Sequence, residues 1–128
     1  MIRVVLTALL LAACGGEPGG DGTADAPNTI DASNATVLTV ACPTTADATI
    51  TVNTAGTAYM PMATTVPKNA VVKFMLTAMH DAKPNPLTTT DPGIVVGFGE
   101  TKCLKFTATG TFGFFCTAHS FAGTIAVQ

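Results

Sequence analysis

Two histidines and one cysteine are the residues of this chain best suited to bind a metal ion. Cys116 and His119 are separated by two residues in the stretch GTFGFFCTAHSFAGTIAV, and the only other histidine is His80. A thiolate and two neutral imidazoles are ligands that first-row transition metals favour. The residue types therefore indicate a transition-metal site, provided that the fold brings His80 to the loop of Cys116 and His119.

Other roles for these side chains stay open at this point. The histidines could be ordinary polar residues, and Cys116 could be a buried thiol or half of a disulfide. The same ligands with an open fourth position could hold zinc, although no carboxylate or second thiol has ligand spacing nearby. A Cys–His nucleophile is conceivable, but no orienting partner or substrate-binding motif is visible. We therefore favour a metal site.

Strand alternation places two of the candidate ligands at the ends of apolar rows. Alternate residues of a strand lie on one face. In VVKFMLTAMH one such row consists of Val72, Phe74, Leu76, Ala78 and His80. In TFGFFC the corresponding row is Phe112, Phe114 and Cys116. If the two strands are neighbours, His80 and Cys116 meet at one pole of the domain, with His119 in the loop beside them.

The elements that would carry these rows are strands. Residues 36–128 alternate short β-prone runs with breaks rich in Pro, Gly, Asn and Asp, and no amphipathic helix is evident. The runs are 36–42, 48–52, 70–76, 93–98, 101–108, 111–116 and 123–127. This pattern predicts an all-β fold, a β-sandwich of Greek-key type. A net charge of −2 and the absence of a basic run argue against a nucleic-acid partner.

The first 35 residues differ in composition from the rest. Residues 1–13 have a single Arg and then an apolar run, as a signal peptide does. The sequence LAAC at residues 11–14 resembles a bacterial lipobox, which implies cleavage before Cys14 and acylation of its thiol. Residues 14–35 are rich in Gly, Pro, Ala and Asp and are expected to form a flexible tether. The folded domain is expected to span 36–128, lipid-anchored in the bacterial envelope on its periplasmic or extracytoplasmic side.

Two longer stretches resemble a known family. NAVVKFMLTAMHDAKPNP resembles the strand and loop that carry the first histidine in the plastocyanin-like branch of the cupredoxins. GETKCLKFTATGTFGFFCTAH resembles the signature before and through the cysteine–histidine loop. The resemblance implies a cupredoxin-type β-sandwich and one copper ion cycling between Cu(I) and Cu(II). The ligands it implies are His80, Cys116 and His119, a set typical of blue-copper electron-transfer sites.

Two departures from the family pattern concern the site. The family usually has Met five residues after the loop histidine, where this chain has Thr124, a weak axial ligand or none. The residue after the first histidine is often Asn, whose side chain ties the ligand loops together, and here it is Asp81. An aspartate could do the same or add negative charge near the metal. The remaining methionines are expected to pack in the core; they are Met60, Met62, Met75 and Met79.

The resemblance implies electron transfer, without enzymatic activity, by a monomer that meets redox partner proteins transiently. The family's loop histidine usually forms the solvent edge through which electrons pass, a role that falls here to His119. Phe121, with its neighbours Ala122 and Gly123 and with Pro84 and Pro86, could form a docking patch, although Phe121 could simply pack the loop. A copper carrier using the same ligands and a metal-free β-sandwich scaffold are the alternatives.

The two remaining cysteines are expected to form a disulfide. With Cys14 assigned to lipid and Cys116 to metal, Cys42 and Cys103 are left. Cys103 shares its strand face with Thr101 and Lys105 and so points away from the core, and Cys42 ends another expected strand. A Cys42–Cys103 bond fits an oxidising compartment; two unpaired thiols are the alternative.

Overall fold

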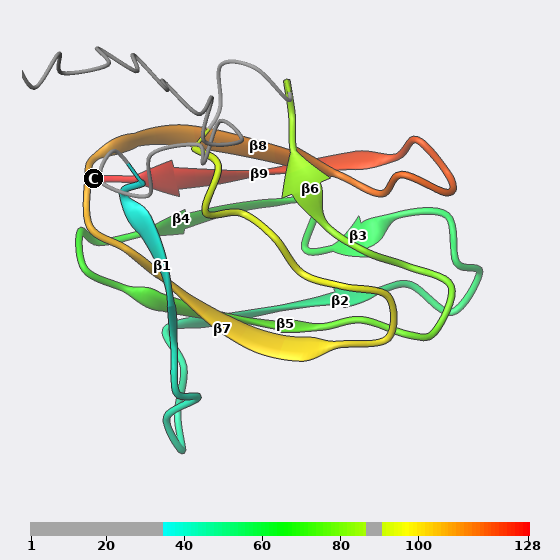
Figure 1. Ribbon diagram of the computed structural model, residues 1–128, viewed down its shortest axis with the longest axis horizontal. Coiled ribbons are helices and arrows are strands. Elements are labelled where there is room, and N and C mark those ends of the chain that lie inside the picture. The colour runs from blue at the N-terminus through cyan, green and yellow to red at the C-terminus, as the bar shows by residue number, and fades with distance from the viewer. Residues whose placement is uncertain (1–34, 87–90) are drawn as a thin grey trace, which may run out of the picture.

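The computed structural model describes residues 35–86 and 91–128 as two β-sheets packed against each other (Figure 1). The signal peptide 1–13, the lipidation site Cys14 and the tether, except residue 35, lie outside the described residues. These three assignments therefore stay predictions. Among the described residues there is no helix long and apolar enough to cross a membrane.

The two sheets are both mixed. The five-stranded sheet has the order β1-β7-β5-β2-β3, in which only β2 and β5 pair in parallel. Its strands are β1 (Val37–Val40), β2 (Ala48–Val52), β3 (Tyr59–Met60), β5 (Val71–Met75) and β7 (Thr101–Phe106). The four-stranded sheet has the order β4-β9-β8-β6, with β4 and β9 parallel. Its strands are β4 (Ala63–Val66), β6 (Lys83–Pro84), β8 (Gly110–Phe115) and β9 (Ala122–Val127).

The two apolar rows predicted from alternation face each other across the sandwich. Phe74 of β5 and Phe114 of β8 are both fully buried, and their rings meet edge to face with centroids 5.3 Å apart. The strands β5 and β8 are therefore neighbours across the core and belong to different sheets. The buried row continues from β5 to Leu76, the residue after the strand, and ends there, since Ala78 is exposed. A turn then carries the chain to His80.

Some elements differ from the sequence expectation. Residues 93–98, expected as a strand, make only an isolated bridge between Val96 and Ala82. Glycines and the turn from Gly97 to Glu100 interrupt the run, since the Gly97 N–H donates to the Glu100 carboxylate. The short strands β3, β4 and β6 had no alternating apolar pattern to indicate them.

The four methionines that the structure describes are on the surface, so the expectation that they pack in the core is wrong. The exposed fractions are 43% for Met75 and between 54% and 66% for Met60, Met62 and Met79. Met75 shares the outward face of β5 with Val71 and Lys73, and Met79 lies in the turn before His80. The core is filled by aromatic and branched side chains instead.

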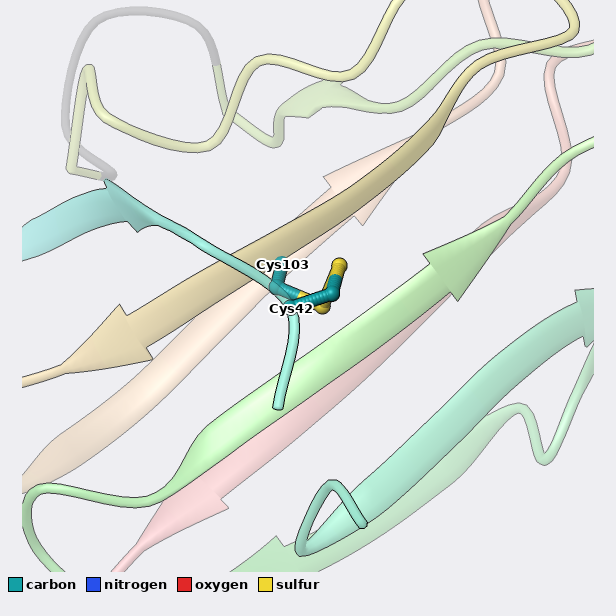
Figure 2. The surroundings of a disulfide bond; sticks show 2 residues. All are labelled: Cys42 and Cys103. Atoms are coloured by element: carbon teal, nitrogen blue, oxygen red, sulfur yellow. A yellow bond between two sulfur atoms is a disulfide. The ribbon is translucent and has the colours of Figure 1, made fainter. Parts of the chain in front are cut away.

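The disulfide expected from the sequence is present in the structure. Cys42 and Cys103 are joined with their Cα atoms 5.1 Å apart (Figure 2). Cys103 lies on the outer face of β7 opposite Val40 of β1, and the chain continuing past β1 covers it completely. The bond therefore fastens the edge strand β1 to β7.

One carboxylate anchors the start of the domain to a distant loop. Asp91 accepts hydrogen bonds from the backbone N–H and the hydroxyl of Thr36 and, through its other oxygen, from the Gly93 N–H. Gly93 approaches β1 so closely that a Cβ there would lie 1.9 Å from the Val37 carbonyl oxygen. These contacts hold loop 91–93 against the first residues of β1.

We expect Asp91→Ala to lower the free energy of unfolding by about 1–3 kcal/mol, because three partly buried donors lose their acceptor. Urea titration would measure the change. Asp47→Ala is the matched control, since the exposed Asp47 accepts one bond, from the Val71 N–H, and should cost less. Equal losses in the two variants would contradict this role of Asp91.

Candidate metal centre

Three potential ligand atoms gather at one end of the sandwich. The loops that follow β2, β5 and β8 lie together there, on the right in Figure 1. The Cys116 Sγ atom is 3.8 Å from His80 Nδ1 and 3.6 Å from His119 Nδ1, and the three ligand atoms lie within 4.8 Å of one another. An ion held about 2.0–2.3 Å from three coplanar ligand atoms separates them by about 3.7 Å. The spacing therefore fits a single transition-metal ion.

His80 reaches the cluster from a tight turn after β5. Its backbone N–H donates to the Thr77 carbonyl, and its own carbonyl and that of Thr77 accept from the Gly99 N–H. The side chain is 5% exposed, and Gly56 packs so closely that a Cβ there would lie 3.3 Å from His80 Nε2. Burial and, to a smaller extent, His119 lower the pKa of His80, whereas Asp81 acts in the opposite direction. The lowered pKa favours the neutral imidazole, the form that binds metal.

Cys116 and His119 are held by a short closed loop after β8. The Cys116 N–H donates to the Phe121 carbonyl, and the Ser120 N–H donates to the Cys116 carbonyl. Ser120 takes a positive φ of 60° to close this loop. Cys116 is fully buried and is a free thiol, so the alternative in which it forms half of a disulfide is wrong. His119 is exposed and presents the cluster to solvent.

Aromatic rings line the inner side of the cluster. The centroid of the Tyr59 ring lies 4.7 Å from the centroids of the Phe114 and Phe121 rings. The Phe121 ring also contacts the ligand histidines, with centroid distances of 5.5 Å to His80 and 6.1 Å to His119. Burial is the main cause that raises the pKa of Tyr59, followed by Cys116 and Asp81, so the hydroxyl stays protonated. The apolar wall excludes water from the buried side of the cluster.

A second set of contacts joins the two ligand-bearing segments. The Asp81 carboxylate accepts hydrogen bonds from both the backbone N–H and the hydroxyl of Thr117, each at 2.8 Å. The Tyr59 hydroxyl donates to the Asp81 backbone carbonyl. Tyr59, Gly56 and Thr117 were not singled out from the sequence, because their roles depend on contacts between distant segments. Tyr59 is the chain's single tyrosine, but its position in the sequence has no periodic signal.

Thr124 does not face the cluster, which corrects the expectation that it occupies the axial position. In β9 the inward residues are Gly123 and Ile125, paired with Phe114 and Phe112 of β8. Thr124 is exposed on the opposite face, opposite Gly113, and its N–H donates to the Met62 carbonyl. Because β9 starts at Ala122, alternation turns Thr124 outward.

The docking patch expected around the loop is only partly on the surface. Pro84 and Gly123 are buried, Phe121 and Ala122 are half-buried, and Pro86 is exposed. Phe121 packs on the rings of Tyr59, His80 and His119. This agrees with the alternative in which Phe121 packs the loop instead of forming a docking surface. Two exposed apolar side chains lie at or beside the His80 turn: Met79 belongs to the turn, and Phe98 precedes Gly99, whose N–H donates to the turn.

The sequence matches a known family over most of its length. A family model described as a cupredoxin-like domain matches residues 29–127. The chain belongs to the cupredoxin-like family. Its two mixed sheets confirm the predicted all-β Greek-key sandwich, and the resemblance to cupredoxins is confirmed. No curated protein matches the sequence.

Solved structures similar to this cupredoxin-like domain include amicyanins and a plastocyanin. A reduced Cu(I) form of an amicyanin point mutant at pH 4 is 19% identical, with a TM-score of 0.55, covering 73% of this chain and 99% of the amicyanin. Amicyanin from Paracoccus versutus is 16% identical, with a TM-score of 0.53 and the same coverage. Oxidised plastocyanin from Dryopteris crassirhizoma is 19% identical, with a TM-score of 0.54, covering 62% of this chain and 99% of the plastocyanin. At these identities the similarity shows the fold.

Proposed function

We propose that this protein transfers electrons through one copper ion in a mononuclear type 1 site. The observation that carries the proposal is the cluster of His80 Nδ1, Cys116 Sγ and His119 Nδ1 at ligand spacing. Membership of the cupredoxin-like family and the fold shared with amicyanin and plastocyanin support copper as the metal. One thiolate with two imidazoles is the ligand set of blue-copper sites.

Copper would supply a one-electron couple, Cu(II) and Cu(I). His80 and Cys116 hold their ligand atoms in a buried frame, and the hydrogen-bonded loop from Cys116 to Phe121 fixes the third. A fixed frame reduces the rearrangement that accompanies a change of charge. His119 is the exposed ligand, so we assign to it the edge at which redox partner proteins dock transiently.

Copper titration of the purified protein tests this proposal. We expect one equivalent of Cu(II) to give an intense visible thiolate-to-copper band and a narrow copper hyperfine splitting in the EPR spectrum. Ascorbate should bleach the band and an oxidant should restore it. A colourless protein that still binds Cu(I) would contradict electron transfer, and absence of copper binding would leave the metal-free scaffold.

A copper carrier is the second candidate, and the surface methionines favour it. Thioethers are soft ligands suited to Cu(I), and Met60, Met62 and Met79 are each more than half exposed. A carrier would hand Cu(I) to an acceptor within seconds without a stable blue form. Stopped-flow transfer of Cu(I) to a chelator, compared between the wild type and a triple Met→Leu variant, separates the two functions.

We further propose that the protein acts at the bacterial cell envelope as a lipid-anchored monomer. The lipobox-like sequence ending at Cys14 carries the anchor. The Cys42–Cys103 disulfide supports an oxidising compartment outside the cytoplasm. Mass spectrometry of the protein from bacterial membranes would detect acyl chains on Cys14, and Cys14→Ala should release it into the soluble fraction.

A further inference from the structure

Asp81 is a buried carboxylate without a cationic partner in the part of the chain that the structure describes. It is 1% exposed and is, with His80, one of two polar or charged residues buried there. The ion pair formed within residues 35–86 and 91–128 joins Lys102 to Glu100 and does not involve Asp81. A buried charge is costly unless something compensates for it. The compensation at Asp81 must therefore come from hydrogen bonds and from what the adjoining site binds.

The hydrogen bonds account for both carboxylate oxygens. The Thr117 N–H donates to Oδ1 and the Thr117 hydroxyl donates to Oδ2, each at 2.8 Å. Tyr59 donates to the backbone carbonyl of Asp81 and leaves the carboxylate free for Thr117. Two donors directed at the two oxygens are what an ionised carboxylate accepts.

This carboxylate is connected to both ligand-bearing segments. Asp81 directly follows His80 in the chain, and Thr117 directly follows Cys116. With neutral imidazoles, the Cys116 thiolate and Asp81 together give the protein side of the site a charge of −2. A bound divalent ion brings the net charge of the ion, the Cys116 thiolate and Asp81 to zero, whereas a bound monovalent ion leaves a net charge of −1.

We propose that Asp81 is a positioning residue that sets the charge preference of this site, favouring a divalent over a monovalent ion. The proposal rests on the metal-binding role proposed above. For copper it means that Cu(II) is the electroneutral state. When a redox partner reduces Cu(II) to Cu(I) by one electron, the assembly acquires a net negative charge, so Asp81 lowers the reduction potential. Asp81 itself does not bind the ion; its hydrogen bonds go to Thr117.

The test compares the affinities of the wild type and Asp81→Asn for Cu(I) and for Zn(II), measured by competition with chelators. Asparagine keeps the shape and can accept from the Thr117 N–H while donating to its hydroxyl. We expect Zn(II) binding to weaken more than Cu(I) binding, because the attraction of the Asp81 charge scales with the charge of the ion, so that the ratio of Zn(II) to Cu(I) affinity falls by about tenfold or more. The reduction potential of the copper form should rise.

A purely structural role predicts a different result. If Asp81 only ties the loops together, Asp81→Asn will lower the affinities for Cu(I) and Zn(II) by the same factor. We expect this parallel loss for Thr117→Val, which loses the hydroxyl donor and keeps the charge of Asp81. A parallel loss or an unchanged ratio would overturn the proposal. Asp47→Asn is the matched control, since this exposed carboxylate precedes β2 at the end of the sandwich away from the cluster, and it should leave the ratio unchanged.

Two further comparisons keep the result decisive. Asp81→Ser removes the charge with a smaller side chain and should shift the ratio in the same direction if Asp81→Asn does not fold. A wild type that binds copper without a blue band would refute electron transfer, while the affinity ratio would still test the charge preference. A blue wild type with an unchanged ratio in Asp81→Asn refutes the charge preference alone.

Discussion

Replacing Cys116 by serine is expected to abolish the blue absorption and to weaken Cu(II) binding by more than about 100-fold. Losing only a residue that hydrogen-bonds to a metal ligand costs about 10–100-fold in affinity, and the loss of a ligand itself should cost more. Cys116 supplies the sulfur and the anionic charge among the three clustered ligand atoms. A serine hydroxyl stays protonated at neutral pH and is a hard, weak ligand for copper. Visible absorption, EPR and chelator competition would measure the loss.

The fold should survive this change. Serine is close to cysteine in size, and the hydrogen bond from residue 116 to the Phe121 carbonyl is made by the backbone. We expect the free energy of unfolding to fall by no more than about 2 kcal/mol, from burial of a hydroxyl. Retention of the blue band in Cys116→Ser would refute the assignment of the thiolate.

Thr124→Ala is the matched control for the site. Thr124 lies close to the ligand loop in sequence, but its side chain is exposed on the outer face of β9. We expect the spectrum and the reduction potential of Thr124→Ala to equal those of the wild type. A changed potential would show instead that the threonine reaches the metal.

The ligand cluster was predictable because local patterns agreed with one another. The row ending at Cys116 follows from strand alternation in β8, and the closed loop places His119 three residues later. His80 was placed correctly, although the row that indicated it ends at Leu76 and a turn completes the path. The two histidines of the cluster, His80 and His119, are those that the family resemblance had indicated as ligands.

The errors arose where a strand boundary or a distant contact decides the outcome. Counting five residues from His119 selects Thr124, but the direction of that side chain depends on where β9 begins and on its register with β8. The expectation that Asp81 could tie the ligand loops together is confirmed, but its partner Thr117 was not identified because it lies 36 residues away in sequence. Strand alternation buries Phe74 and therefore places the next residue, Met75, on the outer face of β5. The expectation that Met75 packs in the core relied on its hydrophobicity and left this alternation out.

The disulfide supports the second large prediction, a loss of stability in the double variant Cys42→Ala, Cys103→Ala. The bond spans 61 residues, and closing a loop of that length in the unfolded chain corresponds to about 4 kcal/mol in the chain-entropy model. Among the residues that the structure describes, the strand β1 lies at the edge of its sheet and pairs as a strand with β7 alone. Without the bond, β1 is therefore expected to open first.

Guanidinium titration of the oxidised wild type, the reduced wild type and the double variant would measure this loss. The reduced wild type and the double variant should unfold at the same denaturant concentration, well below the oxidised protein. Hydrogen exchange should increase most in β1 and in its partner residues of β7. Because Cys103 lies on the outer face of one sheet and Cys116 at the end of a strand of the other, copper affinity in native conditions should not change. A loss of less than about 1 kcal/mol would mean that the hydrogen bonds of β1 and the Asp91 contacts hold this edge without the covalent link.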